Sequence, residues 1–246
     1  MKTEDYFKMM FEDTTRYFLP RRTYTIIRLD GKAFHTFTRN MQKPFDQILC
    51  NVMDETMLRL CEEIQGCQFG YTQSDEISLL LTDFEKETTD AWFGGNLQKI
   101  VSVSASMATA FFNVEMDDTP DFAFFDSRAF TISGREDVMD YFIWRQDDCM
   151  RNSIAGLAQS LYSHKELNKK NSNEQQEMIF AKGINWNDRP GREKRGCFAY
   201  KQRVLKFTPE GQEFFRESWF NTPAHDFRKS NILPNSVPEM PEKTMG

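Results

Sequence analysis

Strand-like and helix-like segments alternate along the chain in the order β-α-β-β-α-β, and this order constrains the fold more than any other feature. Alternating or β-branched residues predict strands over 23–30, 67–71, 76–81 and 122–132. A helical spacing of apolar residues predicts helices over 46–64 and 92–112, and a long helix over 136–162 follows. The order is that of the split βαβ unit. The predicted fold class is therefore α+β, with a ferredoxin-like core and a helical C-terminal extension.

The segments that flank this unit are less regular. Residues 4–18 have the pattern of an amphipathic helix that ends before Pro20. Residues 165–177 are polar and are predicted to form a mobile loop, and residues from 209 onward are predicted to form a proline-rich tail. We therefore predict a catalytic core with its N-terminal helix over 1–135, and a helical extension, loop and tail over 136–246. The two parts are expected to form one structural unit.

Composition excludes several classes of protein. The chain has 246 residues, of which 39% are hydrophobic and 14% aromatic, enough to form a buried core. No segment approaches the ~18 to 20 consecutive apolar residues of a membrane span, and the N-terminus lacks a secretory pattern. Five cysteines without a C-x-x-C pair, and three dispersed histidines, argue against zinc. The prediction is a cytoplasmic protein without a membrane partner.

The overall charge does not by itself indicate a nucleic-acid partner. The formal net charge is −6 and the pI is near 5.3, whereas proteins that hold nucleic acid by bulk electrostatics are usually basic. An RNA partner would have to contact local basic groups. The candidates are Lys165, Lys169, Lys170, Arg189, Arg192, Lys194 and Arg195. Basic runs of this kind are more often simply solvated surface.

Two acidic residues lie where neighbouring strands are predicted to end and begin. Asp30 closes the first strand, and Asp75 precedes the third. Because the first and third strands of a split βαβ sheet are antiparallel neighbours, their carboxylates are expected to meet at one edge. Either Asp alone is an ordinary turn residue. Together they supply the hard oxygen ligands that a two-metal site requires, and they would repel each other without a cation.

The residues after Asp30 favour a loop that wraps phosphates. Gly31 lets a ligand approach the backbone closely, and Lys43 is a candidate phosphate contact, although most lysines are only solvated. The loop itself continues through Lys32, Ala33, Phe34 and His35. A Walker-type phosphate loop is absent from the sequence, and no Ser-His-Asp or Cys-His pattern is evident.

An ordered series of motifs resembles the tRNA-histidine guanylyltransferase family and its 3′–5′ polymerase relatives. The similarity extends over about residues 20–203. The motifs are Arg28-Leu-Asp-Gly-Lys-Ala-Phe-His35, Lys43-Pro44-x-Asp46, Gly70-Tyr-Thr-Gln-Ser-Asp-Glu76, Trp92-Phe93, Lys99, Phe125-Asp-Ser-Arg128, Tyr141-x-x-Trp144-Arg145-Gln146-x-Asp148-Cys149 and Gly183-Ile-Asn-Trp-Asn.

The resemblance implies a catalytic domain similar to a polymerase palm and assigns roles to these residues. Asp30 and Asp75 would bind two Mg²⁺ ions with help from the Gly31 carbonyl, and Glu76 would support catalysis beside them. The nucleoside triphosphate would contact Asp30, Gly31, Lys32, Ala33, Phe34, His35, Lys43, Ser74 and Asp75. Contacts to phosphate or RNA are expected from Lys99, Arg128 and Asn152.

The implied chemistry is nucleotide addition to the 5′ end of tRNA after that end is activated with ATP, with GTP or other triphosphates as substrates. Eukaryotic members carry His-Ile-Asn-Asn where this chain reads Met150-Arg-Asn-Ser153. This difference favours the branch of guanylyltransferase-like proteins found in bacteria and archaea, which repairs 5′-truncated tRNA by copying the opposite strand. A single guanylate addition to tRNA-histidine, a non-catalytic nucleotide- or RNA-binding module, and nucleotide cyclisation remain as alternatives. The resemblance also implies a homotetramer.

Overall fold

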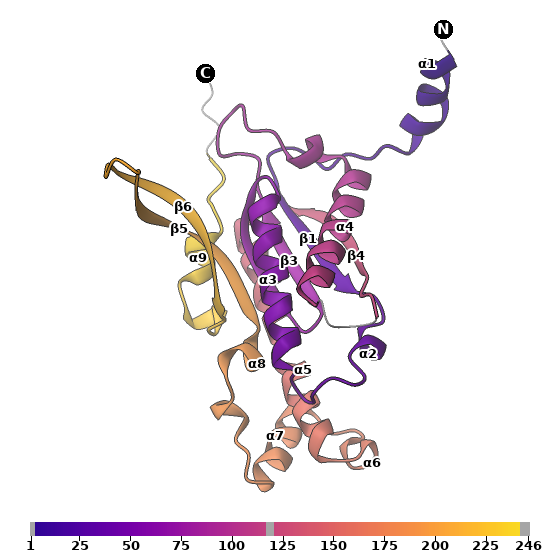
Figure 1. Ribbon diagram of the computed structural model, residues 1–246. Helices are drawn as coiled ribbons and strands as arrows, with labels where there is room; N and C mark the ends of the chain where they lie inside the picture. The colour runs from indigo at the N-terminus through magenta and orange to yellow at the C-terminus, as the bar shows by residue number, and fades with distance from the viewer. Residues whose placement is uncertain (1–2, 117–120, 242–246) are drawn as a thin grey trace.

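The computed structural model describes residues 3–116 and 121–241, and it is built around one antiparallel sheet (Figure 1). Within these ranges the sheet has six strands in the order β4-β1-β3-β2-β5-β6. The strands are β1 (Tyr24–Gly31), β2 (Cys67–Gln73), β3 (Glu76–Leu81), β4 (Phe125–Ile132), β5 (Cys197–Phe207) and β6 (Glu213–Pro223). The first four strands follow the predicted β-α-β-β-α-β order.

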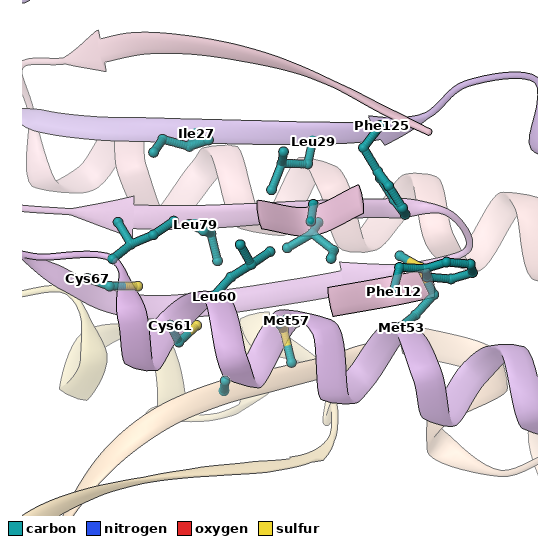
Figure 2. Close-up of a cluster of buried hydrophobic side chains, with 14 of the residues drawn as sticks. Ile27, Leu29, Met53, Met57, Leu60, Cys61, Cys67, Leu79, Phe112 and Phe125 are labelled. Carbon is teal, nitrogen blue, oxygen red and sulfur yellow. The ribbon is translucent and has the colours of Figure 1, made fainter. Parts of the chain in front are cut away.

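Helices cover both faces of the sheet. On one face lie α3 (Gln47–Glu63) and α4 (Leu97–Glu115), and on the other lies α5 (Arg135–Leu161). Alternation along β1 sorts its residues between the two cores, since Ile27 and Leu29 pack with α3 and α4 while Ile26 packs with α5. Figure 2 shows strand residues of the first core directed toward α3. The alternating pattern thus produces a three-layer arrangement.

Asparagine and aspartate side chains fix where the two covering helices begin. The Asp46 carboxylate accepts a hydrogen bond from the Leu49 amide at 3.0 Å, and the Asn96 side chain accepts one from the Lys99 amide at 3.0 Å. Both are N-caps, which satisfy amides that lack a partner in the first helical turn. The prediction that Asp46 opens a helix is confirmed.

The predicted helix over 4–18 is only partly correct. The segment is divided into α1 (Thr3–Phe7), a π-helical turn η1 (Lys8–Glu12) and a 3₁₀ turn η2 (Asp13–Thr15), and it ends before Phe18. None of its residues is buried. Figure 1 shows the segment extending away from the sheet. Its apolar side chains therefore lack the tertiary packing that normally stabilises an amphipathic helix.

The polar segment predicted as a loop over 165–177 is instead helical. It contains α6 (His164–Leu167) and α7 (Ser172–Ala181), and each helix begins with a reciprocal capping box. The capping pairs are Ser163 with Glu166 and Asn171 with Glu174. The helices that follow are η4 (Trp186–Asp188) and α8 (Gly191–Arg195), and they pack near the C-terminal half of α5.

The prediction of a tail from residue 209 onward is also wrong. Strands β5 and β6 form a hairpin that extends the sheet from β2, and its far end projects beyond the body (Figure 1). The following η5 (Phe227–Lys229) and α9 (Ile232–Ser236) return to the face covered by α5, where Phe227 and Leu233 are buried. The segment after α5 is therefore not simply helical. Residues 242–246 lie outside the described part.

None of the helices in the described ranges combines the length and apolar character needed to cross a bilayer.

Candidate active site

Asp30 and Asp75 lie at adjacent ends of two strands. Asp30 is opposite Glu76 in the β1–β3 ladder, and Asp75 occupies the turn between β2 and β3. The Gly31 amide donates a hydrogen bond to the Asp75 carbonyl at 3.1 Å, so the end of β1 is tied to the turn. The predicted convergence of these two positions is present in the fold.

The backbone is strained on both sides of this convergence. Ser74, directly before Asp75, has a φ of 50°, and Ala33, after Gly31, has a φ of 55°. L-residues rarely adopt the left-handed region, at a cost of about 1–3 kcal/mol each. Such strain persists only where the surroundings impose it, and it clusters at functional sites. Both strained residues flank the acidic pair.

The pKa of Asp75 is raised, first by burial and then by the negative charge of Asp30. Hydrogen bonds from its own backbone amide and from the Ser74 hydroxyl oppose this shift. The nearest basic group to Asp30 is Arg128, whose Nη2 lies 3.9 Å from Oδ2 and whose side chain is half exposed. Two carboxylates that disfavour each other's charge form a site that a cation would stabilise.

The donors at this site fit magnesium rather than zinc. Asp30 and Asp75 offer carboxylate oxygens next to the Gly31 backbone, which are hard ligands. In the described part of the chain, no three His, Cys, Asp or Glu side chains are grouped closely enough to hold a metal ion by themselves. In a usual magnesium site one or two carboxylates bind, and substrate phosphates or water complete the shell.

Phe34 anchors the loop that leaves β1. Its side chain is buried, and its ring lies 5.4 Å from the Phe112 ring and 5.2 Å from the Phe125 ring. The Lys32 amide donates to the Phe124 carbonyl at 2.8 Å, which fixes the start of the loop. Of the residues predicted to bind nucleotide here, Lys32, Ala33 and His35 are exposed, whereas Phe34 mainly belongs to the core.

We expect Gly31→Ala to destabilise the protein by about 1–3 kcal/mol. A Cβ at position 31 would lie 2.2 Å from Cδ2 of the Phe34 ring. That ring has no space to move away, because it packs against the rings of Phe112 and Phe125. Urea unfolding should show a lower midpoint for the variant with an unchanged slope. An unchanged midpoint would show that Phe34 does not hold the loop in place.

A cavity of about 280 Å³ opens beside Asp75. It brings together five of the predicted nucleotide-binding residues, and Nζ of Lys43 lies 3.3 Å from the Thr38 hydroxyl at its wall. The lining residues are Phe34, His35, Thr38, Met41, Gln42, Lys43, Pro44, Asp46, Leu49, Ser74 and Asp75. A concave site whose lining includes a lysine and the carboxylates of Asp46 and Asp75 suits a phosphorylated ligand that carries a cation.

Glu76 differs from the other two acids because a basic group already holds it. Arg145 of α5 donates to both Glu76 carboxylate oxygens, at 2.7 and 2.8 Å, and also to Asp148 at 2.8 Å. Burial raises the pKa of Glu76, and the hydrogen bonds from Arg145 oppose the shift. Arg145 had no predicted role, although it lies within one of the quoted motifs.

The residues predicted to contact phosphate or RNA do not form one surface. Arg128 is near Asp30, but Lys99 lies on the first turn of α4, beside the segment that precedes β1 and therefore at the opposite end of that strand. Asn152 of α5 lines a second cavity. Of the proposed basic patches, Arg192 is engaged with Asp54 at 2.7 Å and its side chain is only 11% exposed, so it is not a free surface charge.

Comparisons with known proteins identify the relatives of this chain. Residues 4–133 match the family model described as tRNAHis guanylyltransferase. A bacterial tRNA(His) guanylyltransferase-like protein, solved in complex with ATP, is 40% identical with a TM-score of 0.86, covering 96% of this chain and 99% of its own. A similar bacterial structure in complex with GTP is 38% identical with a TM-score of 0.75, covering 93% and 95%.

A curated relative gives the same assignment. A probable tRNA(His) guanylyltransferase of Drosophila melanogaster is 28% identical over 200 residues, covering 74% of this chain and 68% of its own length. The family match spans more than half of the chain, including β1, which carries Asp30, and the β2–β3 turn, which carries Asp75. The chain therefore belongs to the tRNA-histidine guanylyltransferase family, whose members are nucleotidyltransferases.

Proposed function

We propose that this protein adds nucleotides to the 5′ end of 5′-truncated tRNA, in the 3′–5′ direction and directed by the opposite strand. The observation that carries the proposal is the pair Asp30 and Asp75, tied together at adjacent strand ends beside a cavity that also contains Lys43. The two similar bacterial structures in complex with ATP and with GTP support nucleoside triphosphates as substrates.

In this proposal Asp30, Asp75 and the Gly31 carbonyl would hold two Mg²⁺ ions. When bound, the ions would stabilise the negative charge on the attacking and leaving oxygens of an in-line transfer. The loop from Lys32 to His35, with Ser74 and Lys43, positions the triphosphate. Arg128 places positive charge next to Asp30, where phosphate oxygens would approach.

Glu76 has a positioning role in the same proposal. Its carboxylate is fixed by Arg145, and its backbone is paired with Asp30 across the β1–β3 ladder. The ion pair therefore connects α5 to the strand end that carries the acidic pair. A rigid support of this kind holds reactive groups in a productive geometry.

The proposal that a template strand directs the addition rests on residues of α5. The residues from Met150 to Ser153 differ from the run carried by eukaryotic guanylyltransferases. One of them, Asn152, lines a cavity next to the cavity beside Asp75, which we call the nucleotide cavity. We further propose that the four strands β1 to β4 form a polymerase-type palm. The parts 1–135 and 136–246 would act as one unit, in a cytoplasmic homotetramer.

The test uses 5′-monophosphorylated tRNA transcripts that lack the first nucleotide, with each of the four bases at the opposing position. The expected result is Mg²⁺- and ATP-dependent incorporation of the complementary nucleotide in every case. Guanylate addition only to full-length tRNA-histidine would instead identify a strict guanylyltransferase. Binding without incorporation would identify a non-catalytic module, and a cyclic product formed without RNA would identify a cyclase.

A further inference from the structure

A second cavity, of about 240 Å³, adjoins the nucleotide cavity. The two share Pro44, Asp46, Leu49 and Ser74. The second lies between the start of α3, the end of β2, the middle of α5 and α8. Its remaining lining residues are Phe45, Cys50, Gln73, Cys149, Asn152, Ser153, Gly156, Arg192 and Glu193. No role assigned so far uses most of these side chains.

Gln73, one of the residues that line this cavity, carries an unsatisfied hydrogen-bond acceptor. It is the last residue of β2, and only 3% of it is exposed. Its Oε1 atom is buried and has no hydrogen-bond partner in the described part of the chain. Buried side-chain polar atoms are nearly always paired, so an exception requires an explanation. A donor from a bound molecule would supply one.

Gly156 provides a second, independent observation. It lies within α5, where glycine is less favourable than alanine, and it lines the same cavity. A Cβ at this position would meet no atom within 4 Å outside the adjoining helix backbone. Packing against the rest of the protein therefore does not require glycine. The space in front of residue 156 is open to a ligand.

The two charged side chains that α8 contributes to this cavity already have ion-pair partners. Arg192 donates to both oxygens of Asp54 at 2.7 and 2.9 Å, and Glu193 accepts from Arg189 at 2.7 Å. The Asp46 carboxylate accepts from the Gln42 amide, before α3, and from the Leu49 amide in the first turn of α3. A charged group such as phosphate would gain little here. A neutral molecule with hydrogen-bonding edges suits the cavity better, between apolar walls such as Pro44 and Phe45.

We propose that this cavity receives the nucleobase of a substrate nucleotide, and that Gln73 accepts a hydrogen bond from an N–H group of that base. The space left by Gly156 admits the ring. The proposal rests on the proposed function, because it assumes that the phosphates lie in the adjoining cavity beside Asp75. The base belongs either to the free triphosphate or to the 5′-terminal nucleotide of the RNA.

The first experiment compares a base that has a donor with one that lacks it. Equilibrium binding of ATP and of purine riboside triphosphate, which lacks the exocyclic amine, is measured with Mg²⁺ for the full chain and for Gln73→Met. The parent protein is expected to bind ATP about fivefold to tenfold more tightly, and the variant to bind both equally. The same comparison with RNA that begins with adenosine or purine riboside distinguishes the two sources of the base.

The Gln73→Met variant should remain folded. Methionine has a similar length and removes a buried carbonyl oxygen that receives no hydrogen bond, so the unfolding midpoint should be unchanged or higher. A preference that disappears without loss of stability then reflects a lost contact with the base.

The second experiment fills the space in front of α5. Gly156→Leu should weaken binding of the base-bearing substrate at least about tenfold, because its side chain occupies the open volume. Its helix propensity is better than that of glycine, so stability should not fall. Gln159→Leu, at an exposed position of the same helix outside the cavity lining, is the matched control and should bind like the parent.

The outcomes separate this inference from the function on which it rests. A parent protein that binds neither triphosphate nor RNA and incorporates nothing would overturn the proposed function and this inference with it. An active parent whose base preference survives Gln73→Met in both comparisons would overturn this inference alone. Unaltered binding by Gly156→Leu would do the same.

Discussion

Asp75→Asn is expected to reduce nucleotide incorporation by at least about a thousandfold while leaving the protein at least as stable at neutral pH. The loss follows from removing one of the two carboxylates that would hold the ions, whose charge stabilisation is worth several kcal/mol in the transition state. Asp30→Asn should have a similar effect on activity. Single-turnover incorporation on a 5′-truncated tRNA measures both.

The expectation that Asp75→Asn is at least as stable as the parent protein follows from the raised pKa of Asp75. Burial and the charge of Asp30 favour the protonated form in the folded protein. Between the unfolded pKa, about 3.9, and the higher folded pKa, the folded state binds more protons, so stability falls as pH rises through this window. At neutral pH the charged Asp75 costs stability. An uncharged asparagine avoids that cost, and its advantage should disappear below about pH 4.

Asp140→Asn is the matched control, because Asp140 is exposed on α5 and lies outside both cavities. It should retain the activity of the parent protein. Full activity in folded Asp30→Asn and Asp75→Asn variants would refute the site. A large loss of stability in Asp75→Asn would instead show that the carboxylate supports the turn, and that the strained Ser74 depends on it.

The part of the fold that the sequence predicts well is the part with a simple hydrophobic pattern. Strands β1 and β3 alternate or carry continuous apolar residues, and the covering helices have apolar faces of normal length. Antiparallel pairing of β1 with β3 then brings Asp30 and Asp75 together without further information. This is why the acidic pair was predictable while its surroundings were not.

The hairpin of β5 and β6 was missed because most of its residues are exposed on both faces. Without a buried face there is no alternation to detect, and the prolines of the segment indicated an irregular tail. In contrast, α6 and α7 had a readable signal. Ser163 with Glu166, and Asn171 with Glu174, are capping-box pairs at the correct spacing.

Side-chain partnerships between distant elements were not predictable at all. Arg145 lies 69 positions after Glu76 in the sequence. The pair forms only because α5 packs on the face of the sheet to which β3 contributes Leu80. The unsatisfied Gln73 and the open space before Gly156 likewise depend on how α5 and α8 meet the end of β2. Such features require the packed structure, since no local pattern specifies them.

Arg145→Met is expected to lower the free energy of unfolding by about 3–5 kcal/mol at pH 7 to 8. Glu76 is 6% exposed and loses both of its hydrogen bonds from Arg145. Arg28, with Nε at 3.9 Å from Oε2, is too distant to replace them. The buried carboxylate then keeps only the longer contact with Arg28 and no hydrogen bond from an arginine, which is close to the costly case of a broken buried ion pair.

The pH dependence of this loss has a definite sign. Burial already raises the pKa of Glu76, and removing Arg145 removes hydrogen bonds that lower it, so the pKa rises further. The folded variant then binds a proton that the unfolded chain has released, and its stability increases as pH falls through this window. The deficit measured by urea unfolding should therefore be smaller near pH 5 than near pH 8.

Two further variants distinguish the loss of the Glu76–Arg145 ion pair from other effects of a substitution in α5 on stability. Arg151→Met removes an exposed partner of Asp148 on the same helix and should cost at most about 0.5 kcal/mol. The double variant Glu76→Gln with Arg145→Met should recover part of the loss, because the side chain at position 76 is then no longer a buried carboxylate. If the double variant is less stable than Arg145→Met alone, Glu76 stabilises the fold through contacts other than the ion pair. The connection between α5 and the acidic strand end would then have to be sought elsewhere, for example in the Ser78–Tyr141 hydrogen bond of 2.9 Å.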